Sequence, residues 1–84
     1  MRTNAQIEHF TGSMCSAGRA MLRWTQEDLA VRAGVARRTI SLFESGGREP
    51  TKRVTRDLLE TFEAAGLMFS VDETAVTLKL VKKA

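Results

Sequence analysis

The sequence predicts a mainly α-helical domain of four helices that ends in a short β-hairpin or dimerisation strand. Apolar residues recur every three or four positions between residues 14 and 62, as in amphipathic helices, and capping residues or glycines separate the segments. After residue 66 the pattern changes to strand formers with strict alternation. A chain of 84 residues, 43% of them hydrophobic, can bury one core, so one domain is expected.

Composition narrows the classes of function. The net charge of +3 suits a polyanionic partner but does not by itself identify one. The single cysteine, Cys15, cannot form an internal disulfide, and no Cys/His spacing matches a metal site, so neither metal nor other cofactor is expected. No apolar run approaches the roughly 20 residues that span a bilayer, and the N-terminus lacks a signal-peptide pattern. A cytoplasmic protein without a membrane partner is therefore expected.

Residues 1–12 are polar and lack a sustained period, which makes them a candidate flexible arm outside the core. Gly12 and Ser13 follow as residues typical of a break between structural segments. The first helix is expected to begin at Met14 and to end near Trp24, since its apolar residues follow helical spacing.

Two closely spaced helices are expected next. Thr25 is a capping residue and Asp28 follows three positions later, which predicts a helix start with an acid near the positive end of its dipole. Gly34 can end that helix in the left-handed conformation. The following helix, over residues 36–45, resumes at once and has apolar residues three apart on its inner side.

The fourth helix and the tail complete the prediction. Thr51 caps the helix, which carries an apolar stripe and ends at Gly66. Strands are expected at residues 67–71 and 75–81, joined by a turn at residues 72–74. Such a hairpin is only marginally stable alone, so it must pack on the helices or on another chain. A homodimer is expected, with these apolar residues of the second strand as its contacts: Val76, Leu78 and Leu80.

The turn at Gly34 holds two helices at a steep angle, so that the second helix projects from the surface. A projecting helix fits the major groove of B-DNA, where base edges carry a full donor and acceptor code. Arg37 and Arg38 lie at its N-terminal end and can each donate a bidentate pair to guanine. Without such a motif around them, two adjacent exposed arginines usually belong only to a solvated helix face.

The segments TQEDLAVRAGV and ARRTISLFESG, residues 25–46, resemble the Cro and C1 repressor family, also called the xenobiotic-response-element family. The resemblance extends more loosely over roughly two thirds of the chain and implies a lambda-repressor-like helix-turn-helix domain at residues 13–66. The tail, residues 67–84, lies outside the minimal family pattern and is assigned to dimerisation.

Several site residues follow from this resemblance together with the chemistry of the side chains. Base contacts are expected from Arg37, Arg38, Ser41 and Leu42. Phosphate contacts are expected from Thr25, Gln26, Thr39, Arg48, Lys52 and Arg53. The family also implies a partly buried ion pair that orients the recognition helix, formed by Arg19 and Glu44.

The function that the sequence favours is a transcriptional regulator that binds a palindromic double-stranded DNA operator as a homodimer. The alternative is an antitoxin or antiactivator, which uses the same fold to bind an unidentified protein partner. An enzyme is not expected, because the chain offers one isolated histidine, no paired nucleophile and base, and no glycine-rich phosphate loop. No catalytic residue is therefore assigned.

Overall fold

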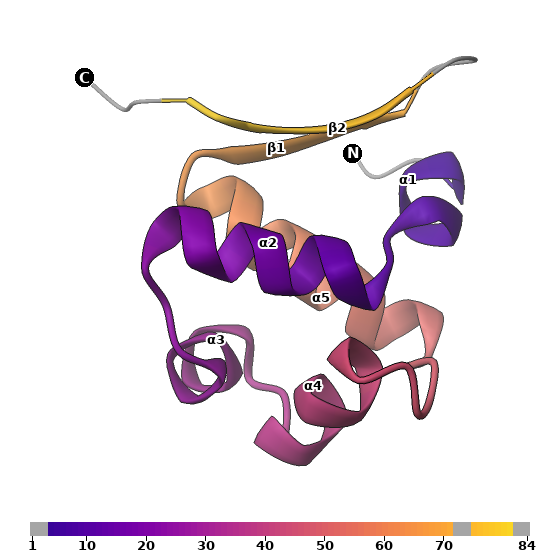
Figure 1. Cartoon of the computed structure of the whole chain (residues 1–84), viewed down its shortest axis with the longest axis vertical. Helices are drawn as coiled ribbons and strands as arrows, with labels where there is room; N and C mark the ends of the chain where they lie inside the picture. The colour runs from indigo at the N-terminus through magenta and orange to yellow at the C-terminus, as the bar shows by residue number, and fades with distance from the viewer. Residues whose placement is uncertain (1–3, 72–74, 82–84) are drawn as a thin grey trace.

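Five helices precede one hairpin in residues 4–71 and 75–81, the part of the chain that the computed structural model describes. The elements are α1 (Asn4–His9), α2 (Gly12–Leu22), α3 (Gln26–Ala33), α4 (Arg37–Glu44), α5 (Lys52–Ala64), β1 (Leu67–Val71) and β2 (Val76–Leu80). They form three layers: the hairpin, then α2 and α5, then α3 and α4 on the opposite side (Figure 1). The predicted mainly helical fold with a C-terminal hairpin is confirmed.

The helix boundaries follow local signals in the sequence. Thr25 and Asp28 form a reciprocal capping box at the start of α3. Gly34 ends that helix at a φ of 67°, a conformation that costs glycine little. Thr51 caps α5 by accepting a hydrogen bond from the amide of Val54 at 3.2 Å. The predicted turn between α3 and α4 is therefore confirmed, and it fixes the relative placement of these two helices.

The expectation that residues 1–12 lie outside the core is wrong for Phe10, which is only 5% exposed. Its ring centroid lies 5.4 Å from that of Phe69 in β1, 5.9 Å from that of Phe43 in α4 and 6.1 Å from that of Phe62 in α5. Helix α1, which no periodicity in the sequence predicts, brings this ring to its place. The N-terminal segment thus joins three elements that are distant in sequence.

Helix α2 begins at Gly12, two residues before the predicted start. Thr11 is its N-cap and accepts a hydrogen bond from the amide of Met14 at 3.2 Å. Gly12 does not break the chain between two segments but is the first residue of α2. A side chain at this position would overlap the backbone carbonyl of Phe43. This glycine allows the start of α2 to approach the end of α4 closely.

The hairpin is antiparallel, and its register pairs Leu67 with Leu80 and Phe69 with Leu78. Leu67 and Phe69 are buried against the helices, so this face of the hairpin closes the core. The second strand, Val76–Leu80, is one residue shorter at each end than predicted. The turn expected at residues 72–74 lies outside the described residues.

Within the described ranges, no helix has the length and apolar character that crossing a membrane requires.

The core is formed by the buried apolar side chains of every helix layer and of β1. Its members are Phe10, Cys15, Leu29, Ala30, Ile40, Phe43, Leu58, Leu59, Phe62, Leu67 and Phe69. Both helices of the outer layer are thereby anchored to one common core.

Candidate nucleic-acid interface

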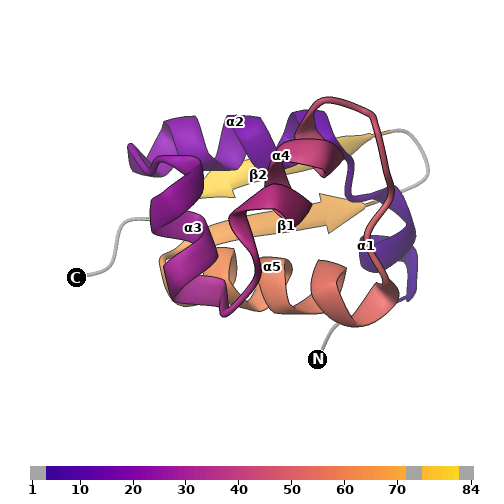
Figure 2. The same cartoon turned by 90° about the horizontal axis from the view of Figure 1, so that it is seen from below.

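Helix α4 is strongly divided into a buried and an exposed side. Ile40 and Phe43 point inward and are 0% and 7% exposed. Arg37, Arg38 and Ser41 lie on the exposed side of the same helix. Because α4 belongs to the outermost layer, opposite the hairpin, these three side chains are accessible to a ligand approaching from that side (Figures 1 and 2).

Two adjacent hollows surround the exposed side of α4. The first, of about 400 Å³, is lined by Arg37, Arg38, Ser41 and Leu42. The second, of about 370 Å³, is lined by Arg38, Thr39, Leu42, Arg48, Glu49, Pro50, Thr51 and Val54. Both hollows share Arg38 and Leu42, so they form one continuous surface. The structure thereby brings together all four expected base contacts and two of the expected phosphate contacts, Thr39 and Arg48.

The charge of this surface is mainly positive but not uniform. Arg48 and Glu49 both line the second hollow, so one carboxylate lies among the cations. Lys52 lies elsewhere, in a hollow shared with Glu8 and α1, although it follows directly on the cap of α5. Arg53 is exposed one residue further along α5. The cations of α5 therefore extend the positive surface away from α4 rather than lining its groove.

One guanidinium group holds three segments together behind α4. Arg19 donates from Nε to Oε2 of Glu44 at 2.8 Å and from Nη2 to Oε1 at 2.6 Å, a bidentate pair between α2 and α4. Its Nη1 donates to the carbonyl oxygen of Trp24 at 3.0 Å, just before α3. The side chains of Arg19 and Glu44 are 17% and 7% exposed. The pair is therefore shielded from water and fixes α4 against α2 and the entry to α3.

Gln26 belongs to the same network, which the sequence predicts only in part. Its Nε2 donates to Oε1 of Glu44 at 3.1 Å, so the first residue of α3 is tied to the last residue of α4. The second proton of that amide remains available for a ligand. The resemblance to the family implies that Gln26 braces the recognition helix, and its hydrogen bond to Glu44 agrees with that expectation. The carbonyl of Trp24 had no sequence signal as a partner of the ion pair, because its contact is made only in the fold.

The network shifts the pKa values of Glu44, Arg19 and the neighbouring Cys15. Burial alone would raise the pKa of Glu44, but hydrogen bonds from Arg19, Gln26 and Cys15 outweigh it and hold that pKa below its usual value. The same hydrogen bond to Glu44 raises the pKa of Arg19. Burial, together with the neighbouring Glu44, raises the pKa of the Cys15 thiol far above its usual range. Cys15 therefore stays protonated and packs beside the pair, as a small buried side chain.

Acid should weaken the fold through Glu44, and we expect the Glu44→Gln variant to show less of this loss. Because the folded-state pKa of Glu44 is depressed, its stabilising contribution is complete above the unfolded value of about 4.5 and is lost as pH falls through the lower folded value. Urea unfolding between pH 7 and 3, followed by Trp24 fluorescence, measures this slope. An exposed carboxylate in Glu60→Gln is the matched control. Equal acid slopes for wild type and Glu44→Gln would contradict the assignment.

The capping box occupies two backbone amides at the start of α3. The amide of Asp28 donates to Oγ1 of Thr25 at 3.0 Å, and the amide of Thr25 donates to Oδ2 of Asp28 at 2.9 Å. These backbone and side-chain hydrogen bonds from Thr25 lower the pKa of Asp28. The amide and the hydroxyl of Thr25 are thus both engaged with Asp28 in the capping box.

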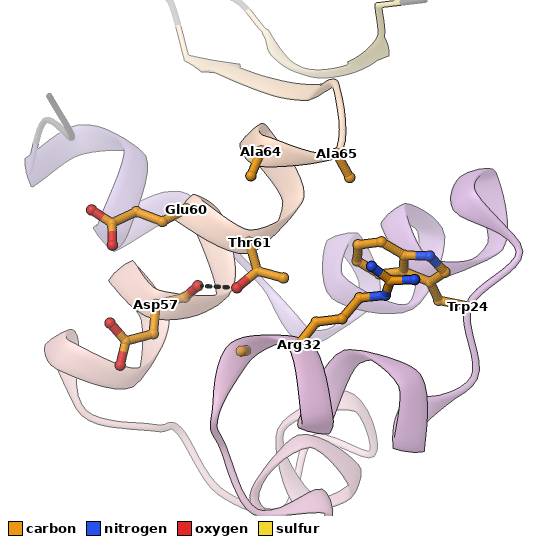
Figure 3. Close-up of a pocket in the computed structure, with 8 residues that line it drawn as sticks. Trp24, Arg32, Asp57, Glu60, Thr61, Ala64 and Ala65 are labelled. Atoms are coloured by element: carbon orange, nitrogen blue, oxygen red, sulfur yellow. Dashed lines mark hydrogen bonds between the residues drawn. The ribbon is translucent and has the colours of Figure 1, made fainter. Parts of the chain in front are cut away.

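A further hollow, of about 460 Å³, lies between α3 and α5, away from the exposed side of α4 (Figure 3). The guanidinium of Arg32 lies over the ring of Trp24, 4.5 Å from its centroid. The hydroxyl of Thr61 donates to the backbone carbonyl of Asp57 at 2.8 Å. Among the residues that the structure describes, no group of three or more His, Cys, Asp or Glu could hold a metal ion.

The arrangement of α3, a tight turn and an exposed basic α4 defines a helix-turn-helix DNA-binding protein. Residues 17–63, more than half of the 84-residue chain, match the Helix-turn-helix family of Cro/C1 type. The chain belongs to this family, and it is a DNA-binding regulator. A comparison with curated individual proteins gives no match. The family match covers α3 and α4 completely and leaves the hairpin outside.

Proposed function

We propose that the protein is a sequence-specific transcriptional regulator that binds a palindromic double-stranded DNA operator as a homodimer. The observation that carries this proposal is the exposed side of α4, where Arg37, Arg38 and Ser41 project from the outermost layer. An α-helix of this kind fits the major groove, and the N-terminal residues of a recognition helix contact base edges. Residues 13–66 would then bind DNA, and residues 67–84 would serve dimerisation.

Arg37 and Arg38 are the proposed readers of guanine, because a guanidinium matches the O6 and N7 acceptors of that base. Ser41 lies one turn further along α4 and can donate to or accept from a base edge. Leu42 is half-buried between the two hollows and presents an apolar surface suited to a thymine methyl group. These four side chains form the proposed base-reading surface.

The proposed phosphate contacts lie on both sides of this base-reading surface. Thr39 and Arg48 line the groove between α4 and α5, and Lys52 and Arg53 continue it along α5. On the other side, Thr25 and Gln26 lie at the start of α3, and Gln26 is tied to the last residue of α4. Such contacts fix the register of a protein on DNA without reading its sequence.

A dimer explains how a small surface can reach useful specificity. Two copies related by a two-fold axis would place two α4 helices in successive major grooves, about 34 Å apart, so the operator would be palindromic. Val76, Leu78 and Leu80 of β2 are the proposed dimer contacts. A chromosomal DNA partner would place the protein in the cytoplasm.

Fluorescence anisotropy tests the proposal directly. We expect the wild-type protein to bind a duplex from its own promoter more tightly than a scrambled duplex of equal composition, at every salt concentration used. Binding to both should weaken as salt rises, because phosphate contacts release counterions. Failure to bind either duplex would overturn the proposal in favour of a protein-interaction module of antitoxin or antiactivator type.

A further inference from the structure

Among the described residues that line the hollow between α4 and the start of α5, Glu49 is the acidic one. We propose that its carboxylate repels DNA phosphate and so limits the affinity of the protein for DNA of every sequence. Glu49 then acts against the phosphate contacts of Arg48 and Lys52. This inference rests on the proposed function, because it requires that these two cations face the DNA backbone.

The segment that contains Glu49, residues 45–51, lies on the side of the molecule that is proposed to meet DNA. It runs beside α4 at the level of the outermost layer (Figure 1), and the view from below shows it on the same face as α4 (Figure 2). Glu49 is exposed in this segment. A duplex that contacts the exposed side of α4 therefore also comes close to Glu49.

Glu49 lies between two residues that are proposed to contact phosphates. It lines the hollow of about 370 Å³ together with Arg48, and it lines the neighbouring hollow of about 300 Å³ together with Lys52. A phosphate held by either cation would therefore come near the carboxylate. Because like charges repel more strongly the closer they lie, the carboxylate offsets part of the attraction that the cations provide.

No side chain neutralises Glu49 within residues 4–71 and 75–81. Its carboxylate makes no hydrogen bond or ion pair there, in contrast to Glu44, whose carboxylate accepts two hydrogen bonds from Arg19. Glu44 is thus compensated inside the protein, whereas Glu49 presents an uncompensated negative charge to the solvent. The charge of Glu49 is available to act on a ligand.

The backbone holds Glu49 close to the two cations. Pro50 follows it directly, and a residue before proline is confined mainly to extended conformations. Thr51 then caps α5, and the amide of Arg48 donates to the carbonyl of Leu42 at 3.3 Å. The chain is therefore tied to α5 on one side of Glu49 and to α4 on the other, so the carboxylate stays next to the phosphate contacts.

A weaker attraction to phosphate changes what holds the complex together. Phosphate contacts supply essentially all of the binding to DNA of unrelated sequence, whereas base contacts supply the discrimination. With Glu49 present, each copy gains less from the backbone of any duplex. Occupancy of an operator then depends more on the base-reading surface of α4 and on the second copy in the proposed dimer.

A series of charges at position 49 tests the inference. The variants Glu49→Asp, Glu49→Gln and Glu49→Lys are titrated by fluorescence anisotropy against the promoter duplex and the scrambled duplex. Glu49→Gln should bind both duplexes at least about threefold more tightly at low salt, because one repulsive unit charge is removed. Glu49→Lys should add a further increase of at least about threefold, and Glu49→Asp, which keeps the charge, should stay within about twofold of wild type.

Salt dependence gives a readout that a change of packing would not move. The slope of affinity against salt should steepen by up to about one unit for each step in charge, and the differences among variants should shrink as salt rises. Glu60→Gln is the matched control, because it makes the same change in an exposed residue of α5 at the hollow between α3 and α5. Its affinity for both duplexes should equal that of wild type.

Each outcome decides the inference. A rise in affinity for both duplexes that follows the charge at position 49 supports it. Equal affinities throughout the series overturn it, as does a Glu49→Gln variant that binds only the promoter duplex less tightly, since Glu49 would then accept a hydrogen bond from cytosine N4. A promoter preference with a flat series shows that the proposed function stands without this role of Glu49. Binding of neither duplex by any variant overturns both.

Discussion

Replacing both Arg37 and Arg38 by alanine should abolish the preference for promoter DNA over a scrambled duplex. Each bidentate arginine–guanine contact contributes about 1 to 3 kcal/mol of discrimination, so two contacts together correspond to at least about a 30-fold loss. Both side chains are exposed on α4, so their removal should leave the fold intact. Fluorescence anisotropy against the two duplexes measures the preference, and far-ultraviolet circular dichroism verifies the helices.

The matched control is Arg48→Ala with Lys52→Ala, which removes the same number of positive charges. These residues are proposed to contact phosphates, so the variant should weaken binding to both duplexes about equally. The slope of affinity against salt should fall by roughly one unit for each phosphate that is no longer neutralised. Specificity should remain. If the two double variants reduced specificity and salt dependence to the same extent, Arg37 and Arg38 would be general electrostatic contacts rather than readers of sequence.

Replacing Glu44 by alanine should lower the free energy of unfolding by about 3 kcal/mol, the cost typical of breaking a buried ion pair. The change removes the acceptor of two hydrogen bonds from Arg19 and one from Gln26, and it leaves a guanidinium that is 17% exposed without its carboxylate. Since these bonds hold α4 against α2 and α3, promoter binding should weaken as well. Urea unfolding followed by Trp24 fluorescence measures the loss of stability.

Two further variants identify the cause. Glu60→Ala removes an exposed carboxylate from α5 and should change stability by less than about 0.5 kcal/mol. Arg19→Met combined with Glu44→Met should recover most of the stability lost in Glu44→Ala, because an apolar pair leaves no buried charge without a partner. A loss below about 1 kcal/mol in Glu44→Ala would show that the pair is too well solvated to orient α4.

The helical part of the fold could be predicted because its signals are local. The capping box of Thr25 and Asp28, the left-handed Gly34 and the cap Thr51 act within a few residues, and the structure has all of them. The exposed side of α4 follows from helical periodicity, because burying Ile40 and Phe43 forces the intervening residues outward.

The N-terminal segment could not be predicted in the same way. Phe10 is one apolar residue in a polar segment, and its burial depends on rings in α4, α5 and β1 that lie far along the chain. Gly12 likewise owes its role to the backbone of Phe43, which only the packing of α2 against α4 brings near. No periodicity within residues 1–12 encodes either contact.

Local sequence patterns thus account for most helix boundaries, for the strand alternation and for the face of α4 that carries Arg37 and Arg38, since these depend on neighbours within one or two turns. The contact of the Trp24 carbonyl with Arg19 became visible only in the folded chain. The same is true of the hairpin, which lies opposite α4 with one edge of β2 open (Figure 1). Such contacts join residues that are distant in sequence, and packing around the common core fixes how closely they approach.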